Sequence, residues 1–289
     1  LFLGARAFES RFADSLFNEA RKHTGKGALE YMLDHFYPIF TQHYEDGLAW
    51  NQHCLRYALL CGDQQLIGRS HLNIGIGFYM RGDYPACLEN YQKALAIFER
   101  LQDNRYIGRT CNEFSVYWRK QKQFEKGLQY LDRAYRACSN CQDTACVETS
   151  LNNRAVIYEM MGNYDLALTY YHKADQVAQS IGDTMGQAYI YMDAAQCYRL
   201  RGDLDSATWL TDRSIEILTK LNNLQGVGLN LINKGDLQVQ QGQLSAALAT
   251  YQQCIELAET LKYPDLLKTA HYQIGKAYAA QKNFEQSFF

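Results

Sequence analysis

A turn-forming position recurs every 40 residues through most of this 289-residue chain. Gly82, Gly162, Gly202 and Gly242 occupy it, and each is followed by a polar residue and then an apolar one. A fixed period of this size is typical of a solenoid, in which each repeat is one supersecondary unit stacked on its neighbours. The period therefore limits the chain to a repeat architecture before any other motif is considered.

Three further positions in each repeat hold small side chains, at helical rather than alternating spacing. In the best-formed repeat Ala155 marks a first helix, Ala167 and Ala174 mark a second one, and Tyr158 supplies a large ring. Small side chains let paired helices approach closely where their ridges and grooves interlock. Because the connections are short, neighbouring helices should be antiparallel. The pattern predicts an all-α fold.

This pattern resembles the tetratricopeptide repeat (TPR) family. The matching residues are Ala155 and Tyr158, the turn 162–164, and Ala167, Tyr171 and Ala174. The common repeat has about 34 residues, so the 40-residue period here is similar to the long-helix type of the Pins/LGN scaffolds, kinesin light chain and the bacterial Rap- and MalT-type regulators. The resemblance implies a right-handed superhelical solenoid of about six to seven helix-turn-helix repeats.

The period also predicts the domain organisation. We expect an N-terminal capping helix over residues 1–23 and a solenoid over 24–289, with repeats at 24–63, 64–103, 104–143, 144–183, 184–223, 224–263 and, truncated, 264–289. A side chain suited to cap the first helix opens most repeats: Asp63, Asp103, Asp143, Asp183 and Asn223. Since the chain opens at Leu1 rather than Met, we expect a longer parent protein.

Composition argues against nucleic acid and membranes as partners. The net charge of −2 lacks the basic surplus expected of a nucleic-acid-binding protein. No apolar run approaches the roughly 18 residues of a membrane span, and no signal peptide is visible. The nine cysteines mostly replace small or apolar residues of the repeat, so we expect reduced core thiols and a cytoplasmic location.

The cysteines at 138, 141 and 146 are the sharpest candidates for metal or redox chemistry. Cys138 and Cys141 have the spacing of a zinc ligand pair or a redox pair. However, all three align with buried apolar positions of other repeats, and neither a second such pair nor a pair of histidines is nearby. We therefore expect packed residues and neither metal nor cofactor. Phosphate loops, nucleophile elbows and zinc-protease motifs are also missing, so we expect a protein that is not an enzyme.

A polar line on the first helices carries the functional prediction. One repeated position on the face opposite the core holds an amide or an acid in every repeat from residue 64 onward, with arginines and tyrosines on the same face. The predicted peptide-binding residues are Arg69, Asn73, Arg109, Asn112, Glu113, Arg119, Asn152, Asn153, Tyr189, Asp193, Arg199, Asn233, Tyr272 and Gln273. The alternative is that this line is a solvated face.

The TPR resemblance implies that first helices line a concave groove and that their asparagines bind a peptide backbone. An amide can donate and accept hydrogen bonds at once, and arginine favours acidic side chains. We predict a non-catalytic scaffold that holds an extended protein or peptide segment in this groove. The alternative function is a sensor module of a bacterial signalling protein, a histidine kinase or transcription regulator. Such a module would bind a short peptide or metabolite and control an effector domain beyond Phe289.

Overall fold

A computed structural model describes residues 11–286 except 21, 24, 38 and 40–43, so the first ten residues of the predicted capping helix lie outside it. Within the described residues the chain forms α-helices and no strands, which confirms the all-α prediction. The helices are α1 (Arg11–Ala20), α2 (Lys26–Asp34), α4 (Tyr44–Cys61), α5 (Gln64–Arg81), α6 (Tyr84–Leu101), α7 (Asn104–Lys120), α8 (Phe124–Asn140), α9 (Thr144–Met160), α10 (Tyr164–Ile181), α11 (Thr184–Arg201), α12 (Leu204–Lys220), α13 (Leu224–Gln240), α14 (Leu244–Thr260) and α15 (Pro264–Gln286).

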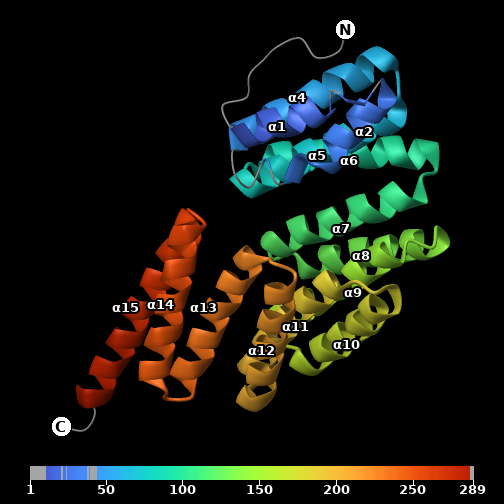
Figure 1. Cartoon of the computed structure of the whole chain (residues 1–289). Helices are drawn as coiled ribbons and strands as arrows, with labels where there is room; N and C mark the ends of the chain where they lie inside the picture. Colours follow the sequence, from blue (N-terminus) through green and yellow to red (C-terminus); the bar gives the residue numbers. More distant parts are fainter. Residues whose placement is uncertain (1–10, 21, 24, 38, 40–43, 287–289) are drawn as a thin grey trace. The chain divides into compact units, whose positions relative to one another are not determined.

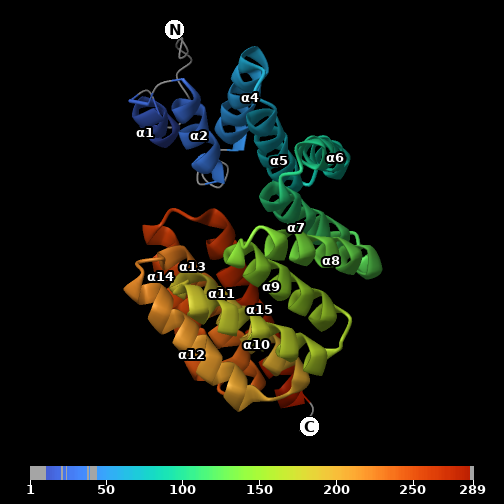
Figure 2. The same cartoon turned by 90° about the vertical axis from the view of Figure 1, so that its right-hand side faces the viewer.

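The helices group into two compact units, residues 1–153 and residues 154–289, and α9 contains the boundary. Figure 1 labels the helices, and Figure 2 gives a second view of the same chain. Within each unit, helices that follow one another in the sequence pack against each other, as in α5 with α6 and α13 with α14. The exact repeat boundaries and the capping role of residues 1–23 stay predictions.

The first unit has an apolar cluster over α1 to the start of α5 and another over α5 to α8. Trp50 of α4 is fully buried, and its indole Nε1 donates a hydrogen bond to the Met32 carbonyl of α2 at 2.7 Å. Farther along, Tyr91 of α6 packs edge-on against Phe114 of α7, with ring centroids 5.5 Å apart. Aromatic pairs in this geometry contribute beyond the apolar area they bury. The first contact joins α4 to α2, and the second joins α6 to α7.

The second unit repeats the same design. In Figure 1 α13, α14 and α15 lie side by side, and their core includes Ile232, Tyr251 and Leu266. Gly235 of α13 lies directly against the Tyr251 ring, since a Cβ built on it would be 2.3 Å from Tyr251 Cε1. Gly75 of α5 has the corresponding contact with Tyr91 in the first unit. A small residue therefore faces a tyrosine at the same repeat position in both units.

Helix ends follow the sequence pattern. Gly82, between α5 and α6, has φ 83°, a left-handed conformation that glycine adopts without a steric penalty. The predicted caps are confirmed at the first helices: the side chains of Asp63, Asp103, Asp143, Asp183 and Asn223 each accept a hydrogen bond from the backbone N–H three residues on. The repeat turn and the cap together fix where each helix begins.

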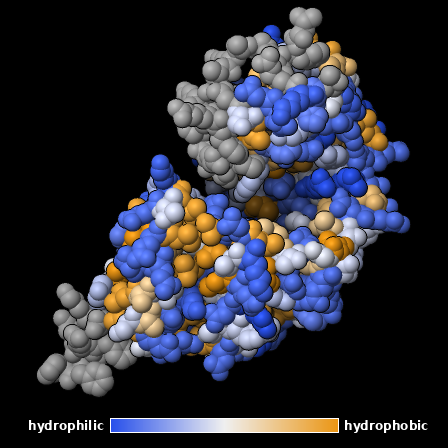
Figure 3. Space-filling model, in the orientation of Figure 1, coloured by the Kyte–Doolittle hydropathy of each residue, from blue (hydrophilic) through white to orange (hydrophobic). Residues whose placement is uncertain are grey.

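The surface is mostly polar. Figure 3 shows hydrophobic side chains gathered over α13 and α14 on the face turned toward the viewer, among charged ones. None of the helices in the described residues is long and apolar enough to cross a bilayer.

Candidate functional site

Five of the predicted site residues come together in the first unit. Arg69, Asn73, Arg109, Asn112 and Glu113 line one pocket of about 390 Å³, which we call the α5–α7 pocket. Its other lining residues are Leu33, Asp34, Phe36, Leu72, Ile76, Tyr106, Ala145, Cys146 and Thr149. The first helices α5 and α7 supply most of this wall, with α2 on one side and the start of α9 on the other. The face singled out from the sequence is therefore hollowed here.

Arginines and one tyrosine form the polar end of the pocket. The guanidinium groups of Arg69 and Arg109 each lie 5.5 Å from the centre of the Tyr106 ring, a cation–π distance. Arg69 Nη2 also lies 2.6 Å from Asp34 Oδ1. Although Arg69 is only 9% exposed, the Asp34 side chain is 64% exposed, so water reaches one side of this ion pair.

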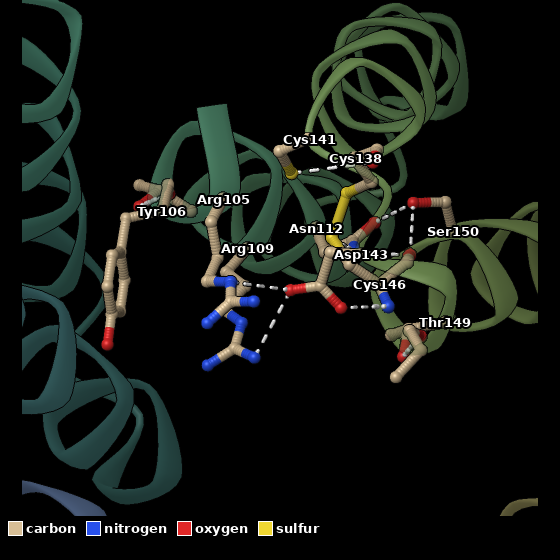
Figure 4. Close-up of a disulfide and its surroundings, with 12 residues drawn as sticks. Arg105, Tyr106, Arg109, Asn112, Cys138, Cys141, Asp143, Cys146, Thr149 and Ser150 are labelled. Carbon is tan, nitrogen blue, oxygen red and sulfur yellow. Dashed lines mark hydrogen bonds and ion pairs between the residues drawn. A yellow bond between two sulfur atoms is a disulfide. The ribbon is translucent and has the colours of Figure 1, made fainter. Parts of the chain in front are cut away.

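Asp143 joins the pocket to the turn before α9. Its Oδ2 lies 3.3 Å from Arg109 Nη2 and 3.4 Å from Arg105 Nε, while its Oδ1 accepts from the Cys146 N–H at 3.2 Å. Figure 4 shows both arginines pointing toward this one carboxylate. Arg69, Arg105 and Arg109 therefore share two aspartates, Asp34 and Asp143. This group has one positive charge more than it has negative charges.

The two buried amides of the pocket have structural partners. Asn73 Nδ2 donates to the Leu33 carbonyl at 3.0 Å, and Asn112 Nδ2 donates to the Cys146 carbonyl at 3.4 Å. Ser150 Oγ donates to Asn112 Oδ1 at 2.9 Å. Both asparagines are under 10% exposed. They tie neighbouring first helices together, which differs from the expectation that these amides face a peptide.

Glu113 is the titratable group at the apolar end of the pocket. Burial raises its pKa to about 7, partly offset by the Tyr91 hydroxyl and the positive charge of Arg119. Tyr91 Oη donates to Glu113 Oε2 at 3.4 Å. Its carboxyl is thus mostly neutral below pH 7 and ionised above it. Arg119 itself is half-buried near the end of α7 and does not line the pocket.

The remaining predicted residues are more dispersed. Asn152 and Asn153 are half-buried on α9, and Asp193 and Asn233 are half-buried on α11 and α13. Tyr189, exposed on α11, accepts at its hydroxyl from Asn223 Nδ2 at 2.9 Å. None of these residues lines the α5–α7 pocket.

A second pocket in the second unit contains two predicted residues. Arg199 and Gln273 line it, with a volume of about 290 Å³. Arg199 Nη1 donates to Gln240 Oε1 at 3.3 Å, and Gln273 Nε2 donates to Asp236 Oδ2 at 3.2 Å. Tyr272, next in the chain, is 66% exposed and has the Lys276 ammonium 5.7 Å from its ring. In this pocket, too, the polar side chains mostly bond to each other.

Sequence reasoning missed several residues of the α5–α7 pocket. Tyr106 and Cys146 were not among the predicted site residues, and Asp143, which holds Arg109 beside the pocket, was predicted only as a helix cap. Tyr106 lies three residues before Arg109 on α7, a spacing that puts two side chains on one helix face. That spacing is the signal that could have placed Tyr106 in the site.

The cysteines require a correction. The sequence predicted reduced core thiols, whereas the structure joins Cys138 of α8 to Cys146 of α9 by a disulfide. Cys141, whose spacing from Cys138 had suggested a zinc or redox pair, is a free thiol, and its Sγ donates to the Cys138 carbonyl at 3.4 Å. Cys138 and Cys146 are adjacent because the turn 141–143 reverses the chain, a tertiary effect that alignment of repeats cannot show. Figure 4 shows the bridge beside Asn112.

The other cysteines are free thiols, most of them buried. Burial raises the pKa of Cys111 and of Cys197 to about 12, which keeps both as unreactive thiols. Within the part of the chain that the structure describes, there is no cluster of three side chains suited to hold a metal ion.

Comparison with known protein sequences identifies the repeat family that this chain resembles. Tetratricopeptide repeat models match residues 143–220 and residues 230–261. No curated protein sequence matches the chain. The predicted resemblance to tetratricopeptide repeats is therefore confirmed by these sequence matches, and the structural similarities below support the solenoid fold class.

Three solved structures show the extent of the similarity. The apo form of the quorum sensor NprR from B. thuringiensis has a TM-score of 0.69 at 20% identity, covering 95% of this chain and 77% of that one. A Rap protein complexed with Competence and Sporulation Factor has a TM-score of 0.67 at 12% identity, covering 93% and 80%. The Rap conjugation gene regulator of plasmid pLS20, in complex with the Phr* peptide, has a TM-score of 0.63 at 13% identity, covering 90% and 74%. At these identities the similarity concerns the fold.

Proposed function

We propose that this chain, which carries tetratricopeptide repeats, binds an extended peptide and places an acidic side chain of that peptide in the α5–α7 pocket. The observation that carries the proposal is the charge imbalance around the pocket. Three guanidinium groups, on Arg69, Arg105 and Arg109, are held by two aspartates. Below pH 7, where the Glu113 carboxyl is mostly neutral, one further carboxylate supplied by a ligand would balance them.

The geometry suits a carboxylate. A guanidinium presents its N–H groups in a planar fork that matches a carboxylate. Arg109 is accessible, with its side chain 48% exposed, and its 3.3 Å contact with Asp143 leaves other N–H groups to donate. The apolar lining residues Leu72, Ile76 and Phe36 suit the methylene groups of an Asp or Glu side chain.

Two of the similar structures support a peptide as the ligand. The Rap protein was solved with Competence and Sporulation Factor, and the pLS20 regulator with the Phr* peptide. The half-buried amide of Asn153 on α9 offers a donor and an acceptor for a peptide backbone in the same unit. The proposal includes no bond-making or bond-breaking step; the chain acts by binding.

A second candidate function is a sensor module. It is favoured by the similarity to a quorum sensor and to a conjugation gene regulator. In that case the same peptide would change the conformation of an attached effector rather than recruit a partner. In both candidate functions the chain binds the same peptide. They differ in whether binding recruits a partner or changes an attached effector.

The proposal is tested by a screen of random heptapeptides against the purified chain, with an Arg109→Glu variant as the matched control. We expect the retained peptides to be enriched in Asp or Glu, and the variant to lose that enrichment. Enrichment in basic peptides, or the same acidic preference with the variant, would contradict the proposal. To separate the two candidates, amide exchange of α13–α15 is measured with and without the selected peptide. A change in exchange there indicates a sensor.

A further inference from the structure

We propose that the Cys138–Cys146 disulfide is a redox switch that sets the affinity of the α5–α7 pocket for its ligand. This inference deepens the proposed function and rests on it for the identity of the ligand. The bridge is part of the pocket wall, because Cys146 lines the pocket directly.

The bridge is connected to both polar groups that define the pocket. Asn112 Nδ2 donates to the Cys146 carbonyl and lies 3.6 Å from Cys146 Sγ. Asp143, between the two cysteines in the chain, accepts from the Cys146 N–H, and its own N–H donates to the Cys138 carbonyl at 3.0 Å. The same Asp143 holds Arg105 and Arg109. A shift of either sulfur therefore moves the anchor of the arginines.

The α7 backbone lies directly against the bridge. A Cβ built on Gly108 of α7 would lie 2.3 Å from Cys138 Sγ and 3.1 Å from Cys146 Sγ, so the α7 backbone rests on the bridge. Two thiols are not bonded and need more separation than a covalent sulfur–sulfur bond of about 2.0 Å. Reduction should therefore push α7 and the start of α9 apart. Arg109 and Asn112 are on α7 within one turn of Gly108, so they would move with it.

The chemistry is an ordinary thiol–disulfide exchange. A dithiol reductant gives two electrons and two protons to the bridge, which becomes two thiols while the reductant becomes a cyclic disulfide. Both cysteines of the bridge are largely buried, at 0% and 5% exposed, but the open pocket reaches Cys146. A ligand in the pocket would cover that route. A reductant can therefore reach the bridge through the empty pocket, and a bound ligand would slow its reduction.

Binding and redox state must then be coupled in both directions. We expect the bridged form, in which the pocket has the geometry described above, to bind an acidic peptide at least tenfold more tightly than the reduced form. By the same linkage, a saturating peptide should lower the reduction potential of the bridge by about 30 mV for a tenfold ratio.

The test uses the whole chain after oxidation with oxidised glutathione and after reduction with dithiothreitol. Alkylation in denaturant counts the free thiols. The affinity for the selected acidic peptide is then measured in both states. Amide exchange is followed over residues 104–120 and 144–153. We expect seven alkylated thiols in the oxidised chain and nine in the reduced one. Reduction should weaken binding at least tenfold and speed exchange in both segments.

Two variants serve as controls. Cys138→Ala/Cys146→Ala should not respond to oxidation or reduction in any readout, whereas Cys141→Ala should respond like the parent chain. Nine thiols after oxidation, or equal exchange rates in the two states, would overturn the switch. Equal affinities with clear peptide binding would also overturn it and leave the proposed function standing. If no acidic peptide binds in either state but exchange differs, the proposed ligand is wrong and the conformational switch holds.

Discussion

Arg109 Nη2 on α7 lies 3.3 Å from Asp143 Oδ2 in the turn before α9, so a half-exposed guanidinium is held by a buried carboxylate that also caps the next helix. This contact links a ligand-facing side chain of one repeat to the start of the following repeat. Most of the expected behaviour of the pocket follows from it.

Replacing Asp143 separates its two roles. Asp143→Asn keeps an oxygen that can cap α9 but removes the charge that pairs with Arg105 and Arg109, whereas Asp143→Ala removes both. We expect Asp143→Ala to lower the free energy of unfolding by about 1–2 kcal/mol and Asp143→Asn to lower it by less than that. Urea denaturation measures both. Equal losses for the two variants would mean that the cap contributes nothing.

Asn112 and Asn153 should behave differently although both were predicted to bind the ligand. Asn112 is buried and bonded to Ser150 and to the Cys146 carbonyl, so Asn112→Ala should cost about 1–3 kcal/mol of stability by leaving buried groups unpaired. Asn153 is half-buried, and Asn153→Ala should change stability by no more than about 0.5 kcal/mol. It should weaken peptide binding by roughly 1 kcal/mol. Thermal unfolding and titration with the peptide give the two values.

Much of this fold could be predicted from the sequence because solenoid contacts are local and repeat. The caps at Asp63 and Asp183 and the turn at Gly82 depend only on residues within one turn, so the pattern was enough to place them. The site was predicted only in part. The pocket needed Tyr106 and Asp143 as well as the arginines, and the pairing of Cys138 with Cys146 depends on how one turn folds. Asp143 is visible in the repeat only as a cap, and the repeat shows neither its contact with the arginines nor the bridge.

Stability should depend on pH through Glu113. Burial raises its pKa in the folded chain to about 7, above the ordinary value of 4.5. The folded chain therefore binds more protons than the unfolded chain between these values, and stability should fall as the pH rises from about 4.5 to about 7. The loss from this one group is roughly 3 kcal/mol at most. Glu113→Gln, which keeps an acceptor for Tyr91, should flatten that part of the pH–stability curve.

Peptide affinity should depend on the same group. Above pH 7 the ionised Glu113 adds a negative charge to the pocket and cancels the positive excess of the arginines. We expect the affinity for an acidic peptide to fall as the pH rises through about 7, and the Glu113→Gln variant to lose this dependence. The peptide affinities of the parent chain and the variant are compared by titration at pH 6 and pH 8, ~1 pH unit on either side of this pKa. A pH dependence that survives in the variant would assign it to another group.

The packing of the repeats can be tested with two glycines at one repeat position. Gly235→Ala would place a Cβ 2.3 Å from Tyr251, so we expect it to destabilise the chain by about 1–3 kcal/mol. Gly275 has no atom within 4 Å of its ideal Cβ, and Gly275→Ala should be neutral or should stabilise α15 by up to about 1 kcal/mol. Denaturation of the two variants gives the difference. If both variants are neutral, the helix pairing at Gly235 is wrong.

The central claim is that Arg109 binds a carboxylate of an extended peptide, and a double-mutant cycle tests it most directly. The affinity of the selected acidic peptide and of its Asn or Gln counterpart is measured by fluorescence anisotropy against the parent chain and against Arg109→Ala. The exposed Arg136→Ala on α8 is the matched control. We predict a coupling energy of about 1–2 kcal/mol between Arg109 and the peptide carboxylate, and none for Arg136. Additive effects of the two changes, with no coupling, would contradict the account.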